Sequence, residues 1–310
     1  MRIVFAGTPD FAVPPLQALI KSEHPVVGVF TQPDRPSGRG RKLTPSPVKQ
    51  LALEAGIEVF QPNSLKTEEQ RAPLEALRPD LLVVVAYGLI LPQAVIDLPP
   101  LGCINIHASL LPRWRGASPL QHAVLRGDSE SGVTLMFIEP RLDAGPMLLK
   151  KKTPISADDT AGDLHDRLTR LGAEALIELL PRLAAGTCMA EQQDDAHATY
   201  AGKISKEDAV LDWCLPALEL ARRVMAYNPW PVAETLYNGQ TLRIWRARAI
   251  DIPADAPPGT LLASKSGLEV ATGKGRLDIL ELQLPGGKRI TARDFLNAKP
   301  MLDCMLGASD

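Results

Sequence analysis

The chain has 310 residues, of which 45% are hydrophobic and 23% charged, and its formal net charge is −2. This composition is typical of a globular protein long enough for two domains, and it excludes a disulfide-stapled scaffold and a strongly basic nucleic-acid-binding module. Any contact with nucleic acid must therefore come from a local basic patch. The four cysteines are scattered without metal-ligand spacing, so we expect no metal and a reducing compartment.

The N-terminal residues Arg2 to Ala6 predict a strand that begins at the second residue, and no basic segment leads into a long apolar stretch. No window reaches the ~18 consecutive apolar residues that a membrane span needs. We therefore expect a cytoplasmic protein with no membrane partner.

The first half of the chain alternates short apolar runs with amphipathic stretches. Runs rich in Val, Ile and Leu are typical of strands covered on both faces, and they lie at Ile3–Ala6, Val26–Thr31, Ile57–Phe60, Leu81–Ala86, Cys103–His107 and Val133–Ile138. Helices are expected between them, at Phe11–Lys21, Val48–Ala55, Glu68–Leu77 and Leu120–Arg126. This alternation predicts an α/β fold with a Rossmann-like, open, mostly parallel sheet, whose ligands bind beyond the carboxyl ends of the strands.

The second half changes character after a long helix predicted at about residues 160–185. The polar stretch that follows is typical of a linker, and beyond it a helix at Pro216–Ala226 precedes short strands separated by glycine turns. These strands predict a small C-terminal β-barrel-like (OB-like) domain. We predict a catalytic domain over residues 1–187, a linker over 188–207 and the β-barrel-like domain over 208–310.

The segment Cys103–Ser109 carries the clearest chemical signal. In a strand, Asn105 and His107 share one face near its carboxyl end, whereas Ile104 and Ile106 point into the core. An amide and an imidazole on a rigid strand can both donate hydrogen bonds to an oxygen that gains negative charge. The same spacing also fits two satisfied polar residues at a strand end.

Asp143 lies in a turn just after the apolar strand Val133–Ile138. A carboxylate arriving from a neighbouring strand end could hold His107 in its charged form or take up a proton. The alternative is an ordinary turn residue beside Gly145. Between the strand and the next helix, the loop Pro112–Pro119 contains Arg113, Trp114 and Arg115, which suits either an anion site or an exposed basic turn.

Asn105-x-His107, Ser109–Pro112, Trp114–Gly116 and Asp143 together resemble the signature of the formyltetrahydrofolate-dependent formyltransferases. Further stretches narrow the resemblance to the methionyl-tRNA formyltransferase family and extend it over essentially the whole chain. They are Phe5–Ala12, Thr31–Pro36, Gly38–Lys42, Pro45–Lys49 and Asn228–Pro231.

The resemblance implies transfer of a formyl group from 10-formyltetrahydrofolate to the α-amino group of methionyl-initiator tRNA, a step of translation initiation. It makes Asn105, His107 and Asp143 catalytic, with the oxyanion of a tetrahedral intermediate held by the first two. It also implies that the enzyme acts without a metal, and we expect a monomer. The folate-binding residues implied by the resemblance are Tyr87, Gly88, Leu89, Ser109, Leu110, Leu111 and Pro112.

Residues 34–49 form a loop that is basic and rich in glycine and proline, and the sequence predicts an irregular, mobile conformation. A run of charge is usually a solvated face, but the resemblance implies that this loop enters the acceptor-stem region of the tRNA. The residues implied to bind tRNA are Arg35, Arg39, Arg41 and Lys42, and the C-terminal domain would offer a further basic face.

Three alternatives remain. A formyltransferase acting on a sugar nucleotide or on glycinamide ribonucleotide would share Asn105, His107 and Asp143, but the basic loop and the C-terminal domain favour tRNA. A dinucleotide-binding oxidoreductase is disfavoured because Gly7 is followed by Thr8 and Pro9, so the G-x-G-x-x-G pattern is absent. A non-catalytic RNA-binding module is disfavoured by the near-neutral charge.

Overall fold

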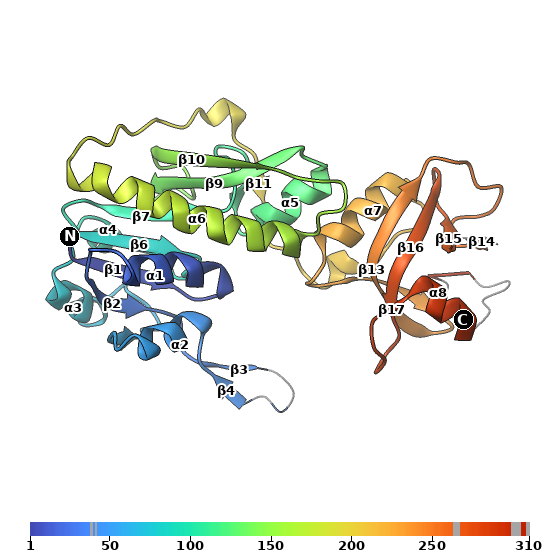
Figure 1. The fold of residues 1–310 in the computed structure, drawn as a ribbon, viewed down its shortest axis with the longest axis horizontal. Helices are drawn as coiled ribbons and strands as arrows, with labels where there is room; N and C mark the ends of the chain where they lie inside the picture. The colour runs from blue at the N-terminus through green and yellow to red at the C-terminus, as the bar shows by residue number, and fades with distance from the viewer. Residues whose placement is uncertain (38–39, 41, 263–266, 299–304, 308–310) are drawn as a thin grey trace. The chain divides into compact units, whose positions relative to one another are not determined.

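The computed structural model describes residues 1–37, 40, 42–262, 267–298 and 305–307. Contacts divide the chain into two compact units (Figure 1). The first comprises Met1–Pro119, Glu130–Thr153 and His165–Ala201, and the second comprises Leu120–Ser129, Pro154–Leu164 and Gly202–Asp310. The division into domains and linker at residues 187 and 207 stays a prediction.

The first unit is built on a seven-stranded sheet with the order β10-β9-β7-β6-β1-β2-β5. All pairs from β7 to β5 are parallel, whereas β9 runs antiparallel to β7. The strands are β1 (Ile3–Gly7), β2 (Val26–Phe30), β5 (Val59–Phe60), β6 (Leu81–Val85), β7 (Cys103–His107), β9 (Glu130–Phe137) and β10 (Met147–Pro154). This order confirms the predicted Rossmann-like, mostly parallel sheet.

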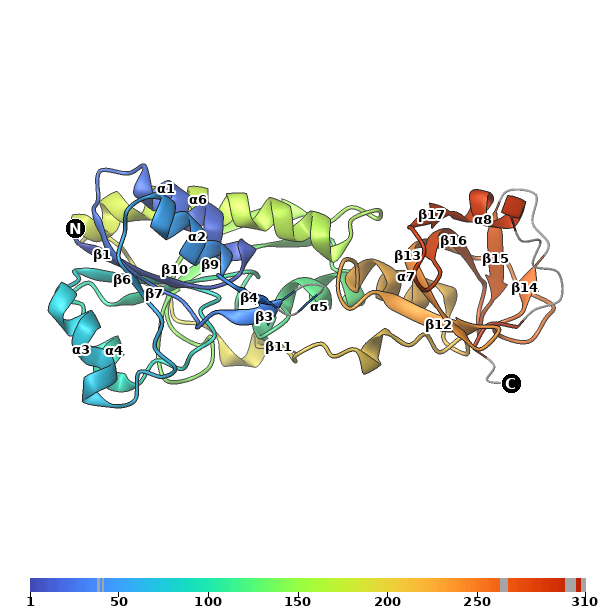
Figure 2. The same cartoon turned by 90° about the horizontal axis from the view of Figure 1, so that it is seen from below.

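Helices cover both faces of this sheet, with α1, α2 and α6 over one face and α3 and α4 over the other (Figure 2). The core on the α3 side includes Val4, Leu82 and Val84 from alternate strand positions, packed with Leu74 of α3 and Val95 of α4. The helices are α1 (Val13–Ile20), α2 (Pro47–Glu54), α3 (Glu68–Leu77), α4 (Gln93–Ile96) and α6 (Ala161–Ala184).

Two small sheets accompany the large one. Strands β3 (Arg35–Ser37) and β4 (Lys42–Thr44) pair as an antiparallel hairpin, so the prediction of a wholly irregular loop over residues 34–49 was wrong. Strands β8 (Arg115–Gly116) and β11 (Tyr200–Ala201) pair in parallel. This second pair ties residues near the end of the predicted linker to the loop that follows β7.

The second unit contains a curled, antiparallel, six-stranded sheet packed against α7 (Ala217–Ala226), which confirms the predicted barrel-like fold. Inward-facing Leu242, Ile244 and Ile279 are fully buried. Its strands are β12 (Ala233–Tyr237), β13 (Gln240–Ile250), β14 (Leu261–Leu262), β15 (Leu268–Ala271), β16 (Arg276–Gln283) and β17 (Ile290–Thr291). The unit also includes most of α5 (Pro119–Arg126) and the short helix α8 (Ala292–Ala298). Within the described ranges, no helix has the length and apolar character required to cross a membrane.

Candidate active site

Strand β7 presents two polar side chains on one face. Ile104 and Ile106 are buried on the opposite face, where Ile106 lies against Gly172 of α6. His107 is only 6% exposed, whereas Asn105 is half-buried. Among the residues that the structure describes, the Asn105 amide has no hydrogen-bond partner, so its N–H groups can serve a ligand oxygen.

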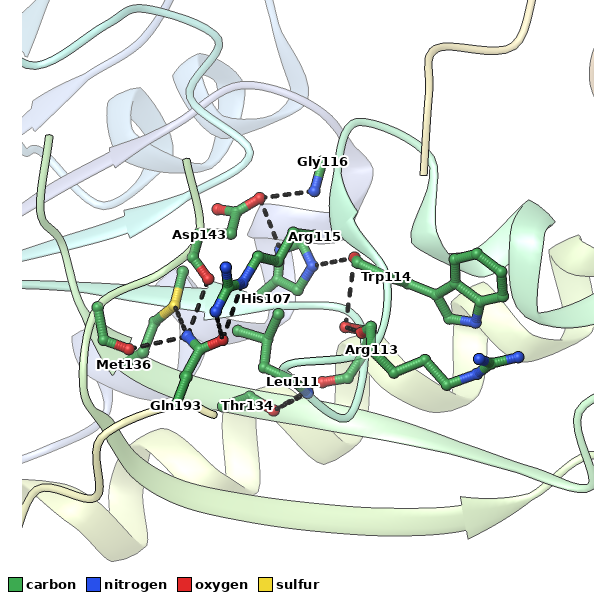
Figure 3. Close-up of polar contacts among 12 residues, drawn as sticks. His107, Leu111, Arg113, Trp114, Arg115, Gly116, Thr134, Met136, Asp143 and Gln193 are labelled. Carbon is green, nitrogen blue, oxygen red and sulfur yellow. Dashed lines mark hydrogen bonds and ion pairs between the residues drawn. The ribbon is translucent and has the colours of Figure 1, made fainter. Parts of the chain in front are cut away.

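The imidazole of His107 lies between a carbonyl and a carboxylate (Figure 3). Its Nε2 is 2.8 Å from the backbone oxygen of Trp114. Because a carbonyl oxygen only accepts, Nε2 carries a proton and donates it. Nδ1 faces Asp143 Oδ2 at 3.7 Å, so Nδ1 is the ring atom at which a proton can be exchanged.

Asp143 follows β9 in a turn and adopts a left-handed conformation with φ of 48°. A non-glycine residue in this region costs ~1–3 kcal/mol unless its surroundings hold it. The backbone N–H of Gly116 donates to Asp143 Oδ2 at 2.8 Å, which anchors the oxygen that also faces His107. The two side chains that the sequence expected to act together therefore lie together.

The segment after β7 is held by its own hydrogen bonds. The Ser109 hydroxyl donates to the oxygen of Arg113 at 2.6 Å, and the Thr134 hydroxyl donates to the oxygen of Ser109 at 2.7 Å. Leu111 is buried with Met136 and Met147 of the neighbouring strands. Of the four residues expected to bind folate here, Ser109 and Leu111 are buried, and Leu110 and Pro112 are partly exposed.

The second segment expected to bind folate follows β6. The Tyr87 side chain is buried in the core, and its hydroxyl has no hydrogen-bond partner in the part of the chain that the structure describes. Burial raises the pKa of Tyr87 above its ordinary value. Gly88 has a φ of 83° and packs against Gln32, so a side chain there would clash. Leu89 is half-buried against the same core. Gly88 is the exposed residue of the three, and the contact of this segment with folate stays a prediction.

The basic hairpin, defined as β3 and β4 with their connection, carries the residues expected to bind tRNA. Arg35 and Lys42 are exposed on its two strands, whereas Arg39 and Arg41 lie outside the described residues. Lys49 has a structural role, because its Nζ binds Asp34 Oδ2 at 2.7 Å and thereby lowers the pKa of that carboxyl. Pairing with Lys49 neutralises the acid at the base of the hairpin.

Arg115 corrects one sequence expectation. Its side chain is 1% exposed, so it is not part of an exposed basic turn. The guanidinium donates to Oε1 of Gln193 through Nε at 3.1 Å and through a terminal nitrogen at 2.9 Å, and it also pairs with Asp195 at 2.9 Å. Through these contacts, Gln193 and Asp195 of the predicted linker 188–207 pack against the loop that follows β7.

Sequence reasoning missed Gln193 and Asp195 because a polar stretch rich in acids carries no periodicity. Two adjacent acids, Asp194 and Asp195, were the one visible signal, and only the second reaches the site loop. Hydrogen bonds from Arg141 and Arg115 lower the pKa of Asp195, so the acid is charged where it meets the buried guanidinium.

With this geometry in view, the chain matches two domain families. Residues 1–180 match the formyl transferase family, and residues 203–300 match the formyl transferase C-terminal domain family. The methionyl-tRNA formyltransferase of Methylococcus capsulatus is 62% identical over 307 residues, which cover 99% of this chain and 100% of that relative. The methionyl-tRNA formyltransferase of Ectopseudomonas mendocina is 58% identical and covers 96% of this chain and 95% of its own length.

Solved structures share the fold at lower identity. The N-formyltransferase from Helicobacter canadensis, in complex with folinic acid and dTDP-3-aminofucose, is 17% identical with a TM-score of 0.67 and covers 94% of this chain and 100% of its own. A glycinamide ribonucleotide transformylase from Symbiobacterium toebii covers 63% of this chain and 94% of its own at 21% identity and a TM-score of 0.51.

Proposed function

Because this chain belongs to the formyl transferase family, we propose that the site around His107 and Asp143 transfers a formyl group to the α-amino group of methionyl-tRNA. The enzyme is a formyltransferase of translation initiation, with relatives of that activity at 56–62% identity. The observation that supports the assignment to this site is the convergence of His107, Asp143 and the half-buried Asn105 at neighbouring strand ends.

The formyl donor is a folate derivative, and we propose that it is 10-formyltetrahydrofolate. Gly88 and Leu89 after β6 and the partly exposed Leu110 and Pro112 after β7 lie beyond the carboxyl ends of adjacent parallel strands. Ligands of such sheets bind at this edge. The apolar character of these residues suits a flat aromatic ring.

The chemistry follows from the partners of each side chain. The unprotonated amine attacks the formyl carbon, and the resulting oxyanion accepts hydrogen bonds from Asn105 and from the Nδ1–H of the doubly protonated His107 ring, because the Nε2–H is committed to Trp114. Asp143 faces the same edge and takes up the proton released by the attacking nitrogen. The intermediate then breaks the bond from the formyl carbon to the folate nitrogen, which receives the proton that Asp143 had taken up.

We propose that the basic hairpin binds tRNA. The residues involved are Arg35 and Lys42 on its strands, and Arg39 and Arg41, which lie between the strands in the sequence. Side chains that neutralise phosphates make binding sensitive to salt. The pairing of Lys49 with Asp34 supports this role, because it removes the nearby negative charge that would oppose a phosphate.

Transfer of a labelled formyl group tests the proposal directly. The enzyme is incubated with labelled 10-formyltetrahydrofolate and charged initiator tRNA, with free methionine and an amino-sugar nucleotide as parallel acceptors. We expect label on the methionyl-tRNA alone. Label on the amino-sugar nucleotide would instead assign the enzyme to sugar formylation, and the absence of label on every acceptor would reject the site.

A further inference from the structure

The side-chain amide of Gln193 hydrogen-bonds both to Arg115 and to the turn that carries Asp143. Its Nε2 donates to the backbone oxygen of Asp143 and to that of Gly145, each at 2.8 Å. Its Oε1 accepts both hydrogen bonds from Arg115. An amide has two N–H donors and one oxygen with two lone pairs, so every hydrogen-bonding position of Gln193 is used (Figure 3).

We propose that Gln193 is a positioning residue that holds Asp143 in its left-handed conformation and thereby sets the carboxylate against His107; the inference rests on the proposed function. Asp143 has a φ of 48° and stands in a loop pressed against β9, where a side chain at Gly145 would clash with the oxygen of Phe137. Such a backbone persists only when its surroundings over-determine it. Gln193 supplies that constraint by donating to the backbone oxygen of Asp143, whereas the Gly116 N–H donates to the Asp143 carboxylate.

Arg115 fixes which way the Gln193 amide points. The guanidinium has donors and no acceptors, so it faces Oε1 and turns Nε2 toward the two carbonyl oxygens. Arg115 is buried, whereas Gln193 is half-buried. Asp195 supplies the counter-charge to Arg115 at 2.9 Å, so Asp195 supports the arginine that orients Gln193.

The variant Gln193→Glu distinguishes an effect on the position of Asp143 from an effect on the stability of the fold. The replacement has nearly the same shape and still accepts from Arg115, but its carboxylate cannot donate to the carbonyls of Asp143 and Gly145. Misplacing a reacting group by ~1 Å costs ~100-fold. We therefore expect kcat to fall about 10- to 100-fold, while KM for methionyl-tRNA and the midpoint of thermal unfolding stay near those of the wild type. Gln192→Glu makes the same chemical change at the exposed neighbouring residue and should leave kcat unchanged.

A double variant tests whether Gln193 acts through Asp143. In the Asp143→Asn background, assayed under single turnover, Gln193→Glu should cause less than a twofold further loss, because coupled residues are non-additive. An equal loss in both backgrounds, a kcat within twofold of the wild type, or a fall in kcat matched by a fall in the folded fraction would overturn the proposal.

Amide hydrogen exchange provides a readout that does not depend on the reaction. Exchange in a peptide covering residues 139–147 should accelerate in Gln193→Glu and not in Gln192→Glu. Unchanged exchange would overturn the positioning role even if the enzyme is active. Accelerated exchange in an enzyme that does not formylate methionyl-tRNA would retain the structural role and reject the proposed function alone.

Discussion

The Nε2–H of His107 donates a hydrogen bond to the backbone oxygen of Trp114 at 2.8 Å. The partner is a carbonyl, so this nitrogen keeps its proton in both charge states of the ring. Nδ1, which faces Asp143, is therefore the nitrogen at which the ring gains or loses a proton. The backbone carbonyl of the loop thus assigns separate roles to the two nitrogens of one imidazole.

Asp143→Asn should reduce kcat by about 100- to 1000-fold, because loss of general-base assistance usually costs 100- to 10,000-fold. The amide keeps the shape of the carboxylate and can still accept from the Gly116 N–H, so the dissociation constant for tRNA should not change. Single-turnover formylation and a filter-binding titration measure the two quantities. A variant with full kcat would remove Asp143 from the chemistry.

His107→Ala removes the donor at Nδ1 together with the ring that spans Trp114 and Asp143. Loss of one oxyanion donor costs about 100- to 1000-fold in kcat, and we expect a fall of at least that size with tRNA binding retained. Asn105→Ala should reduce kcat by a factor within the same range. If His107→Ala kept more than a tenth of the activity, the oxyanion would have to be stabilised elsewhere.

Replacing Arg35 and Lys42 together by alanine should weaken tRNA binding and flatten its salt dependence. Each phosphate contact contributes ~0.7–0.9 to the slope of log K against log salt, so the slope should shrink by about 1.5. The binding constant is measured at several salt concentrations. Lys21→Ala changes an exposed lysine at the end of α1 and should leave the slope intact. An unchanged slope in the double variant would make the hairpin a solvated surface.

Tyr87→Phe should stabilise the protein by about 1 kcal/mol, because it removes a buried hydroxyl that has no partner among the described residues. Burial raises the pKa of Tyr87, so the unfolded chain loses this proton near pH 10 while the folded chain retains it. The wild type should therefore lose stability as the pH rises above about 10, and the variant should lose less. Denaturant titrations at pH 7 and pH 10.5 check both effects, with Tyr200→Phe, an exposed tyrosine, as the control. A raised KM for folate in Tyr87→Phe would show that the hydroxyl meets the ligand after all.

The cysteines should differ in reactivity. Burial, with a smaller contribution from Asp97, raises the pKa of Cys103 to about 12, and its thiol lies in the core. The exposed Cys214 should react with a thiol reagent in the native state, whereas Cys103 should react only after unfolding. Mass spectrometry of the labelled peptides distinguishes them. Early labelling of Cys103 would show that the α4 side of the sheet opens readily.

Apolar runs predicted the sheet well because strands covered on both faces need continuous Val, Ile and Leu. Strand β10 escaped prediction because Lys150, Lys151 and Lys152 interrupt its apolar start. The hairpin β3–β4 escaped because its pairing is local backbone geometry in a stretch whose prolines and glycines indicate a loop. Periodicity reports burial, and edge strands with exposed side chains give little of it.

For the site, strand alternation predicted Asn105 and His107 on one face, and the turn after β9 brings Asp143 to His107. The support from Gln193 could not be predicted, because a contact across 50 residues of sequence leaves no pattern in a single chain. The presence of the C-terminal domain also distinguishes tRNA from sugar-nucleotide substrates less sharply than the sequence suggested. The N-formyltransferase from Helicobacter canadensis shares the fold over 94% of this chain, so the high identity to methionyl-tRNA formyltransferases is what supports tRNA as the substrate.

The pairing of β11 with β8 has a consequence for the order of events during synthesis. Protein chains leave the ribosome from the N-terminus, and the last strand of the large sheet, β10, ends at Pro154. Gln193, Thr199 and Ala201 emerge later, and they hold Asp143, Trp114 and Gly116. A nascent chain that has already formed its central sheet therefore still lacks these contacts to the loops of Trp114 and Asp143 until about residue 201 has been released.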